Sequence, residues 1–306
     1  MADVAVDHRD RVYLLTRHDL GVLVYKQDGS FVKQWSHDLI RPGTHGISIG
    51  PDSSIWIVDY KEHFVAQFTN DGDLQRVIGT PGKGSDTGID ATLPDGFDML
   101  ETITHRGPPF NGPTQLAFAP DGDFFVSDGY RNAAIHHFSS NGDLLGSFGA
   151  PGTGPGQFRN PHSLAVSQDR HLYVADRENW RIQVFSEQGQ LLMVIDDVYR
   201  PSGVALDSDG NLYVAEIEFT PGYHRTFAPI VADKFLPSRL SVFNNAGELI
   251  YRGLIPTEAD QVGGANGIAV DSSGDVYIAE VVHAVYAHRM DVSTTCRPFH
   301  KLVRAT

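Results

Sequence analysis

Apolar and polar residues alternate in short runs along this chain, and the same arrangement returns six times. Each copy has a run of alternating apolar residues, a turn that in most copies contains Gly, and a second run rich in aromatic residues. Alternation with a period of two predicts half-buried β-strands. Turns such as DG, NG and SG predict tight hairpins, because Gly accepts the positive φ angles that they need. The six copies begin at Val4, Gly46, Gln115, Ser163, Gly203 and Gly267.

Further strands follow each copy. After the copy at Gly46, HFVAQF predicts a third strand, TNDG a turn and DLQRVIG a fourth strand. Four antiparallel strands in each of six repeats predict an all-β, six-bladed β-propeller that occupies residues 1–306 as a single domain. The last copy is weaker, and there residues 283–290 are predicted as the third strand and residues 298–305 as the fourth.

Two long insertions interrupt the repeats, at residues 80–114 and 218–238. The first is rich in Gly, Pro, Asp and Thr, and the second contains FTPGYHRTFAPIVADKFLPS. Long loops in a compact domain are often functional. Packing between blades explains them equally well, and both interpretations stay open here.

Composition and charge narrow the class of partner. Hydrophobic residues make up 41% of the chain and charged residues 20%, as in a globular protein. The formal net charge of −14 argues against nucleic acids and anionic membrane surfaces as partners. Cys296 is the only cysteine, and the N-terminal residues MADVAVDHRDRVYLL lack the pattern of a signal peptide. We therefore expect a cytoplasmic protein.

The residue before each repeat's first apolar run is where chemistry is expected, because the first strand of every propeller blade lines the central channel. At this position blades two and four carry His45 and His162. Two imidazoles from different blades can converge on one divalent ion. The simpler alternative is that these are hydrated polar side chains of the channel. The remaining blades place Ala2, Thr114 or Gln115, Ser202 and Asn266 there.

Three segments in the middle of the chain decide between these alternatives. The runs FVSDGYRNAAIHHFS, GQFRNPHSLAV and LYVADRENWRIQVF lie within residues 113–186. In order and spacing they resemble the peptidyl-α-hydroxyglycine α-amidating lyase family, a group of six-bladed propellers of the NHL-repeat type. Upstream, LTRHDLGVLVY and THGISIGPDSSIWIVD resemble the family's first arginine and first histidine segments.

The resemblance implies a set of site residues. His45 and His162 would be two of three zinc ligands, and Tyr130 would be the general base beside the metal. Arg17 and Arg177 would be the active-site arginines that orient the substrate. Further substrate-binding candidates are Asn132, Gln115 and His105. Each has a plainer alternative, since Tyr130 could be a packing aromatic and Arg177 could pair with Glu178 or Asp176.

The sequence departs from the family where the third metal histidine is expected. Asn266 stands there, and its carbonyl oxygen is a weaker zinc ligand than imidazole. Water or another side chain could complete the coordination, with His105, His224 and His283 as candidates. Gly267 stands where the animal enzymes have an acid that binds a structural calcium, so calcium binding is doubtful.

Together these observations predict a lyase that cleaves the C–N bond of an N-acyl-α-hydroxyglycine or a related hemiaminal-like small molecule, with a divalent metal that we expect to be zinc. Two alternatives remain. The first is metal-assisted hydrolysis of a lactone, ester or amide on the same propeller. The second is a non-catalytic NHL-repeat module that binds a macromolecule.

Overall fold

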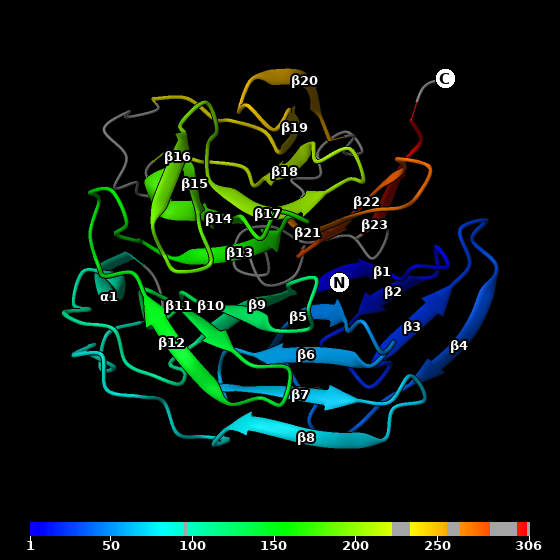
Figure 1. Ribbon diagram of the computed structural model, residues 1–306, viewed down its shortest axis with the longest axis horizontal. Helices are drawn as coiled ribbons and strands as arrows, with labels where there is room; N and C mark the ends of the chain where they lie inside the picture. The colour runs from blue at the N-terminus through cyan, green and yellow to red at the C-terminus, as the bar shows by residue number, and fades with distance from the viewer. Residues whose placement is uncertain (95–96, 222–232, 256–263, 282–298, 305–306) are drawn as a thin grey trace.

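The computed structural model describes residues 1–94, 97–221, 233–255, 264–281 and 299–304. It confirms the predicted all-β, six-bladed propeller, with six sheets arranged around a central channel (Figure 1). The His283 and His224 candidates, and the predicted strand at residues 283–290, lie outside the described residues. Among the residues described, no helix is long and apolar enough to cross a membrane.

Each blade is an antiparallel sheet of strands that follow one another in the sequence. Blades one to three contain β1 (Asp3–Val6), β2 (Val12–Leu15), β3 (Val22–Tyr25), β4 (Phe31–Trp35), β5 (Thr44–Ile49), β6 (Ile55–Asp59), β7 (Phe64–Phe68), β8 (Leu74–Gly79), β9 (Pro113–Phe118), β10 (Phe124–Asp128), β11 (Ala134–Phe138) and β12 (Leu144–Phe148). Blades four to six contain β13 (Pro161–Val166), β14 (Leu172–Asp176), β15 (Arg181–Phe185), β16 (Leu191–Ile195), β17 (Pro201–Leu206), β18 (Leu212–Glu216), β19 (Arg239–Phe243), β20 (Leu249–Leu254), β21 (Ala265–Val270), β22 (Val276–Glu280) and β23 (Phe299–Leu302). Two short helical turns, α1 (Phe97–Leu100) and the 3₁₀ turn η1 (Arg177–Asn179), complete the described elements.

Burial is greatest in the second strand of each blade and least in the fourth. The second strands β6, β10, β14, β18 and β22 are buried along their whole length. The fourth strands are the exposed edges, as in β12, where Leu144 and Leu145 are open to solvent. The core therefore consists of the faces of neighbouring blades packed against each other, which is the reason that isolated repeats of this kind are not stable.

The first strands form the wall of the channel, as predicted. Each of them packs beside the first strand of the next blade, and β21 packs beside β1 to close the ring. The first and last blades close the ring by packing against each other. Among the described residues, each of these two sheets contains strands from its own end of the chain only. The amino group of Met1 donates a hydrogen bond to Glu280 O (3.2 Å), and Gln27 Nε2 donates to Asp271 Oδ2 (2.9 Å).

The prediction for the last strand was wrong. Residues 298–305 were expected to form a fourth strand, but β23 pairs directly with β22, which is the third position of the blade. Phe299 is opposite Ala279, and its ring lies nearly parallel to that of Tyr277 at 6.1 Å. The apolar pattern predicts a strand here correctly, but it carries no information on which neighbour the strand pairs with.

The first insertion is packed against blades three and four. Leu100 and Ile103 join the buried cluster that contains Phe125 and Phe158, and Phe110 is buried against Phe138. These contacts support the packing interpretation for the described part of the insertion at residues 80–114. The same residues also fix a loop of the candidate site, as shown below.

Candidate functional site

A ring of side chains connects the blades at the end of the channel where the first strands begin. Long and short side chains alternate around this ring. Long ones come from blades two, four and six, and short ones from blades one, three and five. In order around the channel the ring positions are Ala2, His45, Thr114, His162, Ser202 and Asn266.

Three equivalent hydrogen bonds follow this alternation, because each long side chain donates to the backbone carbonyl of the short residue in the next blade. The bonds are His45 Nδ1 to Thr114 O (2.8 Å), His162 Nδ1 to Ser202 O (2.6 Å) and Asn266 Nδ2 to Ala2 O (2.8 Å). The threefold repeat shows that Asn266 occupies the same place in its blade as the two histidines occupy in theirs.

These bonds define the tautomer of both imidazoles. A carbonyl oxygen can only accept a hydrogen bond, so the Nδ1 atoms of His45 and His162 must carry the proton. The lone pair of each neutral ring is then on Nε2. Both Nε2 atoms are 3.0 Å from the same atom, the phenolic oxygen of Tyr130. His45, His162 and Tyr130 therefore meet at one point, and we call these three residues the two-histidine centre.

The two-histidine centre has one proton too few. The Tyr130 hydroxyl can donate to one Nε2 only, so the second Nε2 faces the hydroxyl oxygen with lone pairs on both sides. Protonating a histidine does not resolve this conflict at neutral pH. Burial, with a smaller contribution from Arg17, lowers the pKa of His45 to about 3, and burial with Arg177 lowers the pKa of His162 well below its ordinary value. A cation between the two rings would resolve it.

Aromatic contacts support the two-histidine centre on the side of blade two. The ring of Tyr60 lies 4.6 Å from that of Tyr130 and meets the His45 ring edge-on at 6.0 Å. The two imidazoles are themselves 4.7 Å apart and nearly perpendicular. Tyr60 was not identified from the sequence, because it follows β6 in the turn that every blade has.

The first insertion fastens the loop that carries Tyr130. Tyr130 N donates to Gly112 O (3.1 Å), and Thr87 Oγ1 donates to the carbonyl of Arg131 (2.8 Å). On the other side of the loop, Asn132 Nδ2 donates to Gly107 O (2.7 Å). The first insertion thus holds the loop of Tyr130 from both sides. The sequence pattern did not predict this contact between the insertion and the loop.

The two arginines lie on either side of the centre. Arg17 follows β2, and its Nε donates to Thr44 O (2.8 Å), next to His45. Arg177 begins the 3₁₀ turn after β14, and its guanidinium carbon lies 5.6 Å from the centre of the Tyr130 ring. The alternative in which Arg177 pairs with Glu178 is also correct, since Arg177 Nε donates to Glu178 Oε1 at 2.7 Å. The pairing and the position beside Tyr130 do not exclude each other.

The three further substrate-binding candidates are placed apart from one another. Asn132 is buried and bonded to Gly107 and Asp128. His105 is exposed in the first insertion, where its ring bonds Thr104 Oγ1 (2.9 Å). Gln115 lies in the channel, one residue beyond the ring positions.

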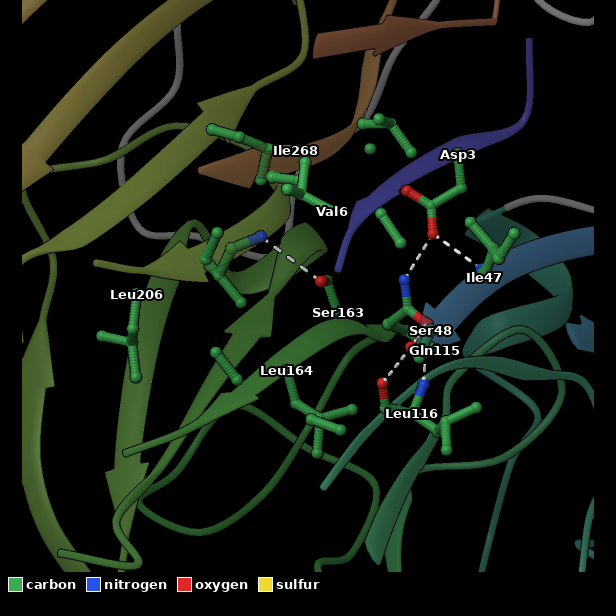
Figure 2. Close-up of a pocket in the computed structure, with 18 of the residues that line it drawn as sticks. Asp3, Val6, Ile47, Ser48, Gln115, Leu116, Ser163, Leu164, Leu206 and Ile268 are labelled. Atoms are coloured by element: carbon green, nitrogen blue, oxygen red, sulfur yellow. Dashed lines mark hydrogen bonds between the residues drawn. The ribbon is translucent and has the colours of Figure 1, made fainter. Parts of the chain in front are cut away.

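A cavity of about 340 Å³ fills the channel beyond the ring, and all six first strands line it (Figure 2). It reaches His45 and His162 at one end and apolar residues such as Val6 and Leu206 at the other. Asp3 is the charged residue of its wall. The Oδ2 atom of Asp3 accepts hydrogen bonds from Ile47 N (2.9 Å) and from Gln115 Nε2.

The carboxylate of Asp3 fills the space beside Gly267. A Cβ atom on Gly267 would lie 1.8 Å from Asp3 Oδ1, so no side chain fits there without displacing Asp3. Gly267 thus offers no ligand for calcium, and the acid at this point of the channel comes from blade one. Burial, partly offset by the bond from Ile47 N, raises the pKa of Asp3 to about 7.

No group of three or more His, Cys, Asp or Glu side chains that could hold a metal ion occurs in the described part of the chain. The donors at the centre are therefore the two Nε2 atoms, with Asn266 in the third equivalent place. Since Asn266 uses its Nδ2 to bond Ala2 O, its Oδ1 is the atom left with lone pairs for a ligand.

Comparisons with known proteins show what this chain is similar to. The NHL repeat matches residues 158–185, which include His162 and Arg177. NHL repeat-containing protein 3 of Homo sapiens is 31% identical over 234 residues, and the match covers 71% of this chain and 62% of that protein. Peptidyl-alpha-hydroxyglycine alpha-amidating lyase 1 of Drosophila melanogaster is 33% identical over 151 residues, which is 46% of this chain and 25% of that one.

Among solved structures, a catalytically inactive virginiamycin B lyase from Staphylococcus aureus with quinupristin has a similar fold, with a TM-score of 0.57 and 15% identity over 90% of this chain and 76% of that one. This likeness concerns the fold alone. The sequence relatives show that the chain contains an NHL repeat and is homologous both to NHL repeat-containing protein 3 and to amidating lyases. The chain spans about 62% of the length of the first of these relatives.

Proposed function

We propose that the protein is a metal-dependent lyase that cleaves the C–N bond of an N-acyl-α-hydroxyglycine or a related hemiaminal-like small molecule. The observation that carries this proposal is the convergence of two Nε2 lone pairs on the hydroxyl of Tyr130. Homology to amidating lyases supports the same reaction type.

His45 and His162 would hold a divalent metal ion, and zinc fits two neutral imidazoles well. Asn266 Oδ1 or water would supply the remaining ligands. When bound, the ion supplies positive charge that makes a substrate hydroxyl more acidic. The Nδ1 bonds to Thr114 O and Ser202 O would keep both rings in the tautomer that binds metal.

Tyr130 would move the proton. As the phenolate it accepts the proton of the substrate hydroxyl, and the C–O bond becomes a carbonyl while the C–N bond breaks. The electron pair of that bond passes to nitrogen, which takes the proton back from Tyr130. The products are an amide and glyoxylate, and the atoms balance without water. The guanidinium carbon of Arg177 lies 5.6 Å from the centre of the Tyr130 ring, so a positive charge stands beside the proposed base.

Arg17 would bind the carboxylate of the substrate. Its Nε is used by Thr44 O, which fixes the side chain beside His45 and leaves the Nη atoms for a ligand. A guanidinium offers two parallel donors to a carboxylate. The substrate would then span the centre from Arg17 to Tyr130.

The test combines metal analysis with turnover. The purified protein is freed of metal, reloaded with one equivalent of zinc and assayed with N-acyl-α-hydroxyglycines for glyoxylate release. We expect metal-dependent glyoxylate production that His162→Ala and Tyr130→Phe both abolish. If both variants keep full turnover, the assignment of these residues is wrong.

The two alternatives give different results in the same experiment. A hydrolase would incorporate oxygen from labelled water into an acid product, whereas the lyase would not. A non-catalytic NHL module would show no metal-dependent turnover of either kind, and would instead bind a macromolecular partner.

A further inference from the structure

A serine, a histidine and an aspartate form a hydrogen-bonded row on blade three, outside the two-histidine centre. His136, on β11, has its Nδ1 atom 2.7 Å from Ser147 Oγ on β12 and its Nε2 atom 3.2 Å from Asp128 Oδ2 at the end of β10. The register of the sheet explains the first contact, because Ser147 is directly opposite His136. We call Ser147, His136 and Asp128 the blade-three triad.

The other partners of Asp128 indicate where the protons of the triad lie. Its Oδ2 atom also accepts from Asn111 N (2.7 Å) and from Asn132 Nδ2 (2.8 Å). An oxygen that accepts in this way needs a donor from the imidazole too, so the proton of the neutral ring is on Nε2. Nδ1 then carries the lone pair, and the hydroxyl of Ser147 donates to it. This is the arrangement of a serine nucleophile with its base.

Blade four shows how a purely structural link looks at the same position. The residue equivalent to His136 there is Gln183, whose Nε2 donates to the equivalent acid Asp176 at 3.3 Å. The residue opposite Gln183 is Val194, which has no polar group in its side chain. An amide is therefore sufficient to hold the acid at the end of the second strand. Blade three has a base at this position instead, with a hydroxyl group opposite it.

The serine is the end of the triad that reaches the surface. Ser147 is partly exposed on the edge strand β12, which pairs with β11 alone among the described strands. His136 and Asp128 are buried, and the ring of Phe110 lies 5.7 Å from the imidazole. Edge strands also have backbone N–H groups that their sheet leaves unpaired, and such groups can donate to an oxyanion. A small acyl group can thus reach Ser147 from solvent, while the base stays buried.

We propose that Ser147 is a nucleophile for acyl transfer from small carboxylic esters, with His136 as its base and Asp128 as the residue that positions the imidazole. Ser147 Oγ forms a bond to the carbonyl carbon, and its proton passes to His136 Nδ1. The bond from that carbon to the alcohol oxygen then breaks, and the alcohol leaves with the proton. Water repeats these steps on the acyl-serine, which releases the acid and restores the hydroxyl.

A serine-directed covalent probe tests this site directly. The protein is treated with a fluorophosphonate, which replaces the proton of a reactive serine with a phosphonyl group as fluoride leaves, and the adduct is located by peptide mapping. We expect the adduct on Ser147 and its loss in Ser147→Ala. Ser140→Ala, in the exposed turn between β11 and β12, is the matched control and should be labelled like the wild type.

His136→Gln tests the base. It places at this position the amide that blade four already has, so the link to Asp128 can be kept while the base is lost. The rate of labelling should fall by about 100-fold or more, as expected for the loss of a general base. Urea unfolding shows whether each variant is as stable as the wild type. An adduct on Ser147 that forms equally fast in folded His136→Gln overturns the proposal, as does a wild type that is not labelled at Ser147.

Ester turnover separates this site from the metal centre. Release of p-nitrophenolate from p-nitrophenyl acetate should fall by about 100-fold or more in Ser147→Ala. Treatment with a chelator should leave this release and the labelling unchanged, although it would remove the proposed lyase activity and any metal-assisted hydrolysis. Ester turnover that is lost with the metal, or that persists in Ser147→Ala, overturns the role of the blade-three triad. Neither result bears on glyoxylate release, so the two proposals fail separately.

Discussion

His45 Nε2 and the hydroxyl of Tyr130 lie 3.0 Å apart, and His162 Nε2 lies at the same distance from the same hydroxyl on its other side. Because the hydroxyl contacts both Nε2 atoms, Tyr130→Phe should change turnover and zinc affinity in different ways. Loss of a general base lowers turnover by about 100-fold or more. Zinc affinity should stay equal or increase, because the hydroxyl no longer occupies the space between the two lone pairs. Turnover is measured as glyoxylate release and affinity by competition with a chelator.

The control for this variant is Tyr251→Phe, at an exposed position on the edge strand β20. It should leave turnover and zinc affinity unchanged. Loss of zinc binding in Tyr130→Phe would contradict the arrangement, because it would make the tyrosine a required ligand.

Asn266→His should complete the metal site. The new imidazole would start from the ring position equivalent to those of His45 and His162, and its Nδ1 would find Ala2 O as the acceptor that Asn266 now uses. We expect zinc affinity to rise by about tenfold or more, since imidazole is a better zinc ligand than an amide oxygen. Chelator competition measures this change. Asn266→Ala is the comparison, and equal affinity in the two variants would show that position 266 does not face the ion.

Asp3 makes the stability of the protein depend on pH. Burial raises its pKa from the ordinary 3.8 to about 7, so between these values the folded protein holds a proton that the unfolded chain has lost. The contribution of Asp3 to the free energy of unfolding therefore falls as pH rises through this window, by at most about 1.4 kcal/mol per pH unit. Above pH 7 the contribution is constant.

Asp3→Asn removes this dependence while keeping an oxygen for Ile47 N and Gln115 Nε2. Urea unfolding at about pH 5 and about pH 8 should show the variant gaining stability relative to the wild type at the higher pH. Asp209→Asn, in an exposed turn, serves as the control. If wild type and Asp3→Asn differed in free energy of unfolding by the same amount at both pH values, the raised pKa of Asp3 would be contradicted.

Glycines next to the ring positions are required for the close approach of the blades. A Cβ atom on Gly203 would lie 2.7 Å from Asn266 O and 3.0 Å from Ile268 Cγ2. Gly203→Ala should therefore reduce the free energy of unfolding by about 1–3 kcal/mol, as overpacking does elsewhere. Gly146→Ala, on an outer strand with no atom within 4 Å of the new Cβ, should be nearly neutral. Equal effects in urea unfolding would show that contact between the blades does not depend on this glycine.

The architecture and the centre could be predicted from the sequence because their determinants are local. Alternation and turn glycines repeat in every blade, and short motifs contain His162, Tyr130 and Arg177. Equivalence of ring positions then places His45 and His162 on the same ring, two blades apart. The structure places the Nε2 atoms of His45 and His162 each 3.0 Å from the hydroxyl of Tyr130, and the roles of these residues stay proposals.

Other features could not be predicted, because they depend on contacts between distant parts of the chain. Asp3 fills the space beside Gly267 only because the two ends of the chain meet when the ring closes. Arg200 stands before a strand in what reads as an ordinary connection, and its partner Glu178 belongs to another blade. The position of β23 depends on the course of the chain between blades and not on its own residues.

The hydrogen bonds that set the tautomers also fasten the propeller. His45, Thr114, His162, Ser202 and Asn266 each bond a backbone carbonyl of the following blade, and Asp3 bonds Ile47 N at the remaining junction. The side chains that we propose as metal ligands thus also hold neighbouring blades together. A substitution at one of these positions therefore also removes a hydrogen bond between two neighbouring blades of the propeller. The activities of such variants are best compared at an equal fraction of folded protein. A lost hydrogen bond between blades and a lost metal ligand would otherwise lower the measured activity in the same way.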